Sequence, residues 1–340
     1  MPDALRVIDF GRVTPLRSQT LWHAAAYGVS AGAPPTLSFA RPSAAYVCLG
    51  YHRGLDEVDQ EYCRRAGLPV YRRMVGGGPV YLDDGQLFFQ ICLPAGMVPA
   101  SRLDALRALL EPAVTAFRAT GADARLDENL EICLGDRKIC GHGAGQIEDA
   151  IVVCGNLIER FDHERATRIL ALADQAQRAE TLRLMRRYVA ATPVEAATFK
   201  SAMSRAYADA LGMTPGPGAV TAAERSRLTE LDERFTSEEW LAGPATGSPA
   251  PRPRARQVKV RAGVWTLAAA EGTARVVASV INGTVARAYL TAPGLNGSTE
   301  AAQRAVTGKP LTAVAGVLDR FGGPGRQLAA AFAAADGRRL

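Results

Sequence analysis

Short apolar and aromatic segments, separated by glycine or by Asp-Gly, dominate the first part of the chain. Such segments predict the strands of a sheet joined by tight turns. A further apolar run, AIVVCGNLI (150–158), has the composition of a buried strand. The other predicted strands in this part are TLSFA (36–40), AYVCLG (45–50), LPVYRR (68–73), GGPVYL (77–82) and LFFQICL (87–93).

Helical periodicity occurs between these strands and continues after them. Residues 17–30 and 102–120 predict helices, and a shorter helix is predicted from Asp56 to just before Gly67. The segment NLEICLGDRKICG (129–141) predicts a hairpin that turns at Gly135-Asp136. From about residue 163 to residue 240 the pattern is mainly helical.

A segment rich in proline, glycine and small residues, GPATGSPAPRPRAR (243–256), then interrupts the periodic pattern. It carries too little apolar surface to fold, so we predict a linker here. The linker separates a large domain (1–242) from a small one (257–340), both α+β. In the small domain we predict strands within 257–270, 274–283 and 284–292, and helices at 298–306 and over about the last thirty residues.

Composition supports a globular protein with two domains. The 340 residues are 48% apolar, enough to bury a full core. The start, MPDALRVIDFG, does not resemble a signal peptide, and no stretch approaches the roughly 20 apolar residues of a membrane helix, so we expect a cytoplasmic protein without membrane contact. Six scattered cysteines without a CxxC pair argue against a disulfide framework and against a zinc site: Cys48, Cys63, Cys92, Cys133, Cys140 and Cys154.

Charge is distributed unevenly between the two domains. The net charge of +6 combines 27 basic and 30 acidic residues in 1–251 with 13 basic and 4 acidic residues in 252–340. A basic module can bind a polyphosphate, a nucleic acid or an acidic protein, and arginine can also simply keep a small domain soluble. The tail lacks a helix-turn-helix pattern and has few aromatic residues among its arginines, which argues against nucleic acid.

Lysine is rare in this chain. Only four of the 40 basic residues are lysines, and Lys138 is the only one in the first 199 residues. Lysine offers a compact point charge on a flexible stem, which arginine does not. Lys138 is therefore a candidate functional residue, with chance as the alternative explanation.

The most informative segment is RRMVGGGPVYLDDGQ (72–86). Three consecutive glycines between two predicted strands let a backbone lie against a ligand, with amide groups free to bind carboxylate or phosphate oxygens. The pair Arg72-Arg73 directly before them adds donors suited to the same anions. A flexible hairpin turn would show the same glycines, and the segment lacks the Lys-Ser/Thr of a P-loop and the spacing of a dinucleotide fingerprint.

A second glycine-rich segment, GDRKICGHGAGQ (135–146), follows about fifty residues later. Its cationic pair Arg137-Lys138 leads into a loop with alternating glycines, which can also surround a polar ligand closely. The sequence thus predicts that Lys138 lies at the entrance of a glycine-lined site.

Together these segments resemble the lipoate-protein ligase family of the biotin and lipoate ligase superfamily, which has RRxxGGGxVYxDxGN-like and RKxxGxxxQ-like segments in this order. The resemblance implies a catalytic domain related to the class II synthetase core, built on a mixed sheet. It also implies ATP and Mg²⁺ as requirements, with no metal ligands assigned. The implied reaction activates lipoate or octanoate as an acyl-adenylate and transfers the acyl group to a lysine of an acidic lipoyl-domain protein.

Roles carry over by position in the two segments. Lys138 would be catalytic, contacting the activated carboxyl group and the phosphate. The residues implied to bind substrate or adenylate are Arg72, Arg73, Gly76, Gly77, Gly78, Val80, Tyr81, Asp83, Gln86, Asn129, Cys140, Gly141, His142 and Gly143.

The sequence departs from the family pattern at several positions, which predicts a divergent branch. The family's Asn-Asp is Asn129-Leu130, its VYHD histidine is Leu82, and its asparagine after the glycine loop is Gln86. Its His-Gly-Thr segment is replaced by VCGN (153–156).

Alternative functions remain at this point. Cysteine-dependent octanoyltransferases share the fold, and Cys140, near Lys138 and His142, is a candidate nucleophile, whereas Cys154 is predicted to be core. His142 is either a general base or a residue that hydrogen-bonds the backbone. The C-terminal domain favours the ligase, because ATP-dependent members commonly have one. A ligand sensor with a nucleic-acid-binding tail is a non-enzymatic alternative. Biotin ligation is a further enzymatic alternative, but the GRGRxxR-like segment of biotin ligases is absent from this sequence.

Overall fold

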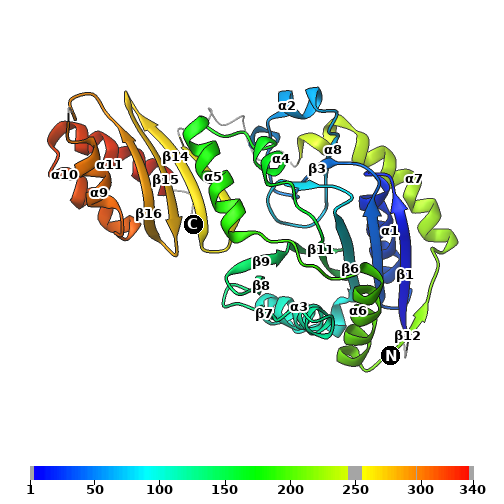
Figure 1. Ribbon diagram of the computed structural model, residues 1–340. Coiled ribbons are helices and arrows are strands. Elements are labelled where there is room, and N and C mark those ends of the chain that lie inside the picture. Colours follow the sequence, from blue (N-terminus) through cyan, green and yellow to red (C-terminus); the bar gives the residue numbers. More distant parts are fainter. Residues whose placement is uncertain (1–3, 244–254, 296, 337–340) are drawn as a thin grey trace. The chain divides into compact units, whose positions relative to one another are not determined.

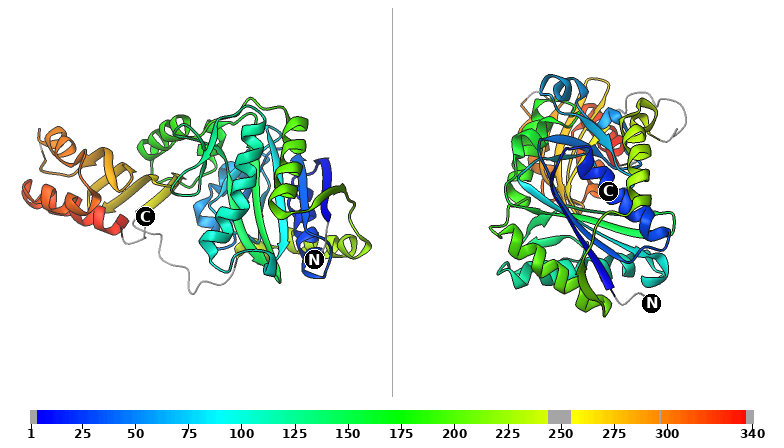
Figure 2. Two further views of the ribbon diagram at one scale, coloured as in Figure 1. Left: turned by 90° about the horizontal axis from the view of Figure 1, so that it is seen from below. Right: turned by 90° about the vertical axis from the view of Figure 1, so that its right-hand side faces the viewer.

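Contacts divide the chain into two compact units. The computed structural model describes residues 4–243, 255–295 and 297–336 (Figures 1 and 2). The first unit comprises Met1–Leu170 and Ala190–Ala245, and the second comprises Ala171–Val189 and Thr246–Leu340.

A six-stranded mixed sheet forms the centre of the first unit. The strand order is β10 (His142–Ile147), β11 (Ala150–Ile158), β6 (Gln86–Pro94), β2 (Thr36–Pro42), β1 (Ala4–Val13) and β12 (Thr214–Pro217). β1 pairs in parallel with β2 and β12, and the other neighbours are antiparallel. The mixed sheet expected for the catalytic domain is therefore confirmed.

Helices cover both faces of this sheet (Figure 1). α3 (Arg102–Ala119) and α6 (Ala196–Leu211) pack on one face, in a cluster with Leu87, Phe89 and Ile91 of β6. α1 (Arg17–Ser30) packs on the other, where Trp22 joins a cluster with Cys92, and α7 (Ala222–Thr236) packs on α1. Because successive side chains of a strand point to opposite faces, a strand covered on both sides is buried and mostly apolar along its length, as β6 is.

Two small sheets adjoin the glycine-rich segments. The triple glycine connects two strands of one, and the second segment begins in the other, whereas its alternating glycines, expected in a loop, lie on strand β10 of the central sheet. One has the order β4 (Val70–Arg72), β3 (Tyr46–Leu49), β5 (Val80–Leu82). The other has β7 (Ala124–Leu126), β8 (Ile132–Leu134) and β9 (Arg137–Cys140), with the β8–β9 hairpin turning at Gly135-Asp136 as predicted. The described residues of the unit also form the short α-helices α2 (Gln60–Arg65), α4 (His163–Arg168) and α8 (Glu238–Ala242).

The second unit is a four-stranded antiparallel sheet between helices. Its strands are β13 (Ala255–Arg261), β14 (Val264–Glu271), β15 (Ala274–Ile281) and β16 (Thr284–Thr291). Leu267 and Val276 lie in the core with α9 (Thr299–Val306), α10 (Val314–Asp319) and α11 (Gly322–Asp336). The neighbour of Leu267, Thr266, points to the opposite face, where its hydroxyl lies 2.8 Å from that of Thr181 in α5 (Gln175–Tyr188).

The position of α5 differs from the expected division of the chain. The predicted large domain includes residues 171–189, whereas α5 packs on β13, β14 and β15 of the second unit. A helical pattern alone does not tell which core a helix will join. The predicted linker (243–256) lies almost entirely outside the described residues, so the functional domain bounds 1–242 and 257–340 stay a prediction. Among the described helices, none is long and apolar enough to span a membrane.

Candidate active site

The triple glycine forms a loop between β4 and β5 that folds around the side chain of Arg73. The buried Arg73 guanidinium donates to the carbonyl oxygens of Gly76 at 2.8 and 3.1 Å and of Gly78 at 3.1 Å. Gly77 has φ of 107°, and a Cβ atom there would overlap Arg73 Nη2. Only glycine fits this position without strain. Arg73 therefore shapes the loop from inside.

Arg72 has a similar supporting position. It is fully buried, and the carbonyl of Arg72 accepts a hydrogen bond from Trp240 Nε1 at 2.9 Å. Its guanidinium donates at 2.6–3.3 Å to five backbone carbonyls, those of Gly50, Tyr51, Arg53, Trp240 and Leu241. The guanidinium thus ties α8 to the strand that enters the glycine loop. Direct contact between Arg72 and a substrate stays a prediction.

The structure brings the two glycine-rich segments together. The Gly76 amide donates to the carbonyl of Ala144 in β10 at 3.2 Å. A Cβ atom at Gly143 would lie 2.9 Å from the Gly76 oxygen, and one at Gly145 would lie 3.0 Å from Val75 Cγ1. The alternating glycines of β10 therefore let the first loop approach closely. This backbone contact is not evident from the pattern of residues alone.

Asn156 of β11 links the two segments by a further set of hydrogen bonds. Its side-chain oxygen accepts from the Gly141 amide at 2.6 Å, and its Nδ2 donates to Gln86 Oε1 at 2.7 Å. Gln86 Nε2 in turn lies 3.4 Å from Asp83 Oδ1, which also accepts from the Gly85 amide at 3.0 Å. Gln86 and Asn156, two positions at which the sequence departs from the family pattern, are therefore hydrogen-bond partners in this chain.

Lys138 lies on β9 with its side chain largely buried. Its Nζ is 2.5 Å from Glu131 Oε2, and the two side chains are only 17% and 4% exposed. Glu131 is not among the site residues predicted from the sequence. The signal available was its position seven residues before Lys138, across the predicted hairpin.

The remaining predicted site residues are distributed around these segments. Val80 is 36% exposed beside the loop, whereas Tyr81 is buried and its hydroxyl accepts from Arg165 at 3.4 Å. Asn129 is exposed, and its amide donates to Asp127 Oδ1 at 2.9 Å. His142 begins β10, opposite Gly155. Their contacts with substrate stay predictions.

None of the six cysteines is exposed, and five are buried. Burial raises the pKa of the Cys140 thiol to about 12, although the Asn156 backbone and Lys138 act in the opposite direction. Burial also raises the pKa of Cys154, which donates to the Gly143 carbonyl at 3.5 Å. Because the thiolate is the nucleophilic form, neither residue is activated in this state.

His23 of α1 supports the segment before the glycine loop. It is fully buried, with Nδ1 2.7 Å from the Gln19 oxygen and Nε2 accepting from the Met74 amide at 3.1 Å. Burial is the main cause that lowers the pKa of His23 to about 3, and the positive charges of Arg73 and Arg234 lower it further. The hydrogen bond to the Gln19 backbone acts in the opposite direction. His23 is therefore a neutral structural residue.

This lowered pKa predicts acid sensitivity. Between pH 6.5 and 3 the unfolded chain binds a proton at His23 that the folded chain does not bind. Each unit by which the pH is lowered in this range therefore decreases the free energy of unfolding by about 1.4 kcal/mol through this group. The free energy of unfolding, measured with urea, should decrease from pH 7 to pH 5 by about 2 kcal/mol less in His23→Gln than in the wild type. An identical pH dependence in both proteins would contradict this prediction.

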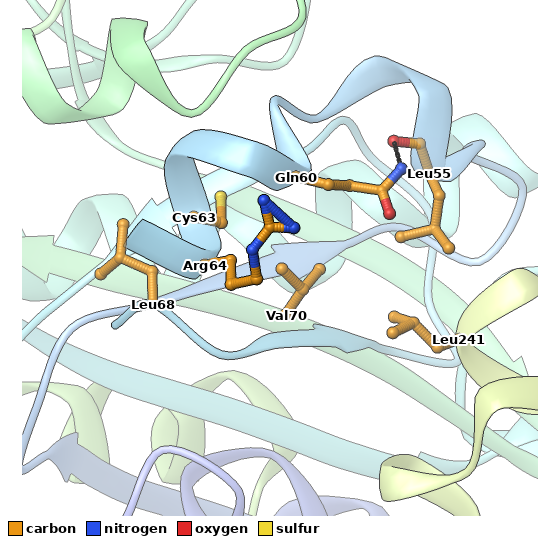
Figure 3. Close-up of a pocket in the computed structure, with 7 residues that line it drawn as sticks. All are labelled: Leu55, Gln60, Cys63, Arg64, Leu68, Val70 and Leu241. Atoms are coloured by element: carbon orange, nitrogen blue, oxygen red, sulfur yellow. Dashed lines mark hydrogen bonds between the residues drawn. The ribbon is translucent and has the colours of Figure 1, made fainter. Parts of the chain in front are cut away.

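A pocket of about 300 Å³ lies among α2, β4 and α8 (Figure 3). The predicted site residues do not line it, so we do not assign it to the candidate site. Arg72 nevertheless contacts its wall, because the Leu241 carbonyl accepts from Arg72 Nη2 at 2.8 Å. The lining residues are Leu55, Gln60, Cys63, Arg64, Leu68, Val70 and Leu241.

Comparison with known proteins identifies the family. The model of the lipoyl protein ligase A/B catalytic domain matches residues 18–207, more than half of the chain and both glycine-rich segments. The chain belongs to this family. The resemblance inferred from the two segments is therefore confirmed, and membership makes the chain a ligase or transferase of lipoyl or octanoyl groups.

Relatives of both reaction types are similar to this lipoyl protein ligase A/B family member. Lipoate-protein ligase A subunit 1 of Thermoplasma acidophilum is 26% identical over 228 residues, covering 62% of this chain and 86% of that protein. Octanoyltransferase LipM of Moorella thermoacetica is 26% identical over 238 residues, covering 61% and 86%. A solved bi-partite lipoate protein ligase from T. acidophilum, described with its E2 lipoyl domain, has a TM-score of 0.64 at 24% identity, covering 74% of this chain and all of that one.

Proposed function

We propose that this protein is an ATP-dependent lipoate-protein ligase. It converts lipoate or octanoate and ATP to acyl-AMP and pyrophosphate, and then transfers the acyl group to a lysine of an acidic lipoyl-domain protein. Adenylation supplies a good leaving group, so the lysine amine of the acceptor can attack the carbonyl carbon and release AMP. No enzyme nucleophile is needed for this route.

The glycine loop supplies donors for the negative charge of these substrates. Within the described residues, the amides of Gly77 and Gly78 make no hydrogen bond, and both glycines are at least partly exposed. Free amides on a glycine loop suit carboxylate and phosphate oxygens. Lys138 adds the cation that stabilises charge developing between the carboxyl group and the phosphate.

The state of Cys140 is the observation that favours the ligase over the transferase. A thioester route requires an accessible thiolate, and burial holds the pKa of Cys140 at about 12. Cys154, the least buried cysteine, has a raised pKa for the same reason. The adenylate route places no such demand on a cysteine.

The basic second unit supports an acidic acceptor. It carries 17 Lys and Arg against six Asp and Glu, counting Ala171–Val189 and Thr246–Leu340. Such a charge steers an acidic domain toward the enzyme. Mg²⁺ typically binds through one or two carboxylates together with substrate phosphates. The described residues contain no group of three or more candidate ligands, so we assign Mg²⁺ to no residue and route no step through it.

An ATP-dependence assay tests the proposal. The protein, octanoate or lipoate, ATP and a lipoyl domain are incubated, and pyrophosphate is measured together with the mass of the lipoyl domain. We expect pyrophosphate in proportion to acylated domain, no acylation from the free acid without ATP, and retained activity in Cys140→Ala. Acyl transfer that needs no ATP and is lost in Cys140→Ala would establish the transferase instead.

A further inference from the structure

The ion pair between Lys138 and Glu131 places a full negative charge beside the proposed catalytic cation. The two atoms are 2.5 Å apart, and Glu131 is almost completely buried. A carboxylate removed from water is stable only with a close partner. In this structure the pair therefore defines where the Lys138 ammonium lies.

The chain before β8 fixes the backbone of Glu131. The Asp127 carboxylate accepts from the amides of Asn129 and Glu131, both at 2.9 Å. The Asp127 amide donates to the Glu131 carbonyl at 3.0 Å, and Leu130 adopts a left-handed conformation with φ of 59°. Asp127 thus closes a tight turn that holds Glu131 at the start of β8.

Lys138 is fixed from its own strand. Its register with β8 shifts between Ile132 and Cys133, so that Cys133 faces Lys138 and Ile132 faces Cys140. Such an irregularity re-aims a neighbouring side chain. The Lys138 carbonyl also accepts from the Ala190 amide at 2.9 Å. The backbone of both residues is therefore fixed by contacts other than the ion pair, and the ion pair positions the Lys138 side chain.

We propose that Glu131 is a positioning residue for Lys138 in this enzyme. It holds the ammonium in the unliganded site, and the anionic substrate competes with it for the same ammonium. The inference rests on the proposed function, because it requires Lys138 to engage a carboxylate or a phosphate. A bound anion must replace part of the stabilisation that Glu131 provides, which favours ligands that develop further negative charge during reaction.

The test is Glu131→Gln, which keeps the shape of the side chain and removes its charge. We expect kcat for acyl transfer to fall about tenfold, because Lys138 is no longer held in place. The KM for the acid should stay equal or decrease, because the competing carboxylate is absent. Glu131→Asp should recover part of the activity. The matched control is Glu128→Gln, an exposed carboxylate of the same turn that should leave both parameters unchanged.

Labelling of lysines gives a second readout that does not require turnover. Acetylation of Lys138, measured by mass spectrometry, should increase severalfold in Glu131→Gln relative to Lys200, whose partner Asp9 is retained. Unchanged kcat together with unchanged labelling would overturn the proposal. A fall in activity with raised KM, lower thermal stability and no rescue by Glu131→Asp would indicate only a structural role. If the wild type transfers acyl groups without ATP, the proposed function fails, and the labelling still decides whether Glu131 holds Lys138.

Discussion

Replacing Lys138 with alanine is expected to reduce acyl transfer at least about 100-fold, the typical effect of removing one donor that stabilises charge in a transition state. Lys138 belongs to the second glycine-rich segment. Its side chain is largely buried, and electrostatic interactions are stronger there than in water. Acylation of a lipoyl domain, followed by its mass, measures the effect directly.

The alanine variant also leaves Glu131 buried without its cationic partner, so a loss of stability has to be separated from a loss of chemistry. Circular dichroism and thermal unfolding of the variant check that it is folded under the assay conditions. Lys200→Ala is the matched control, because it removes a lysine that pairs with Asp9 at 2.7 Å in an exposed ion pair. Near-normal transfer by folded Lys138→Ala would exclude Lys138 from catalysis.

The elements most clearly predicted from the sequence are those whose pattern is imposed by burial. LFFQICL predicts β6 because helices cover both faces of that strand, and the Gly135-Asp136 turn predicts the β8–β9 hairpin. β12 was missed because Thr214–Pro217 has the composition of a turn, which an edge strand tolerates. The unit that α5 joins could not be predicted, since the sheet surface it packs on begins about seventy residues later.

The candidate site was predictable in its glycines and less so in its charges. Glycine positions follow from local geometry, and Gly77 does have the positive φ that the motif suggests. The partners of an arginine depend on the tertiary structure. The guanidinium groups of Arg72 and Arg73 donate to backbone carbonyls in the structure, and the predicted contact of these residues with an anion stays a prediction. The sequence pattern does not identify Glu131, because its ion pair with Lys138 is a contact across the hairpin.

The loop geometry predicts a second large effect, for Gly77→Ala. Its φ of 107° is a conformation that alanine rarely adopts, and the added methyl group would overlap the Arg73 guanidinium. The loop must then move by about 1 Å or expel Arg73 from its carbonyl partners. A displacement of that size at a positioning element can lower the rate about 100-fold. We expect such a loss in acyl transfer, with thermal stability lowered only modestly because the loop is at the surface.

Gly78→Ala is the neighbouring comparison, since no atom lies within 4 Å of a Cβ at that position and its φ is not positive. We expect its effect on transfer to be at least tenfold smaller than that of Gly77→Ala, because the loop can keep its shape around Arg73. Arg73→Ala should lose activity as Gly77→Ala does, because it removes the group around which the loop folds. If Gly77→Ala and Gly78→Ala were equally active, the wrapped conformation of the loop would not be the one that catalysis requires.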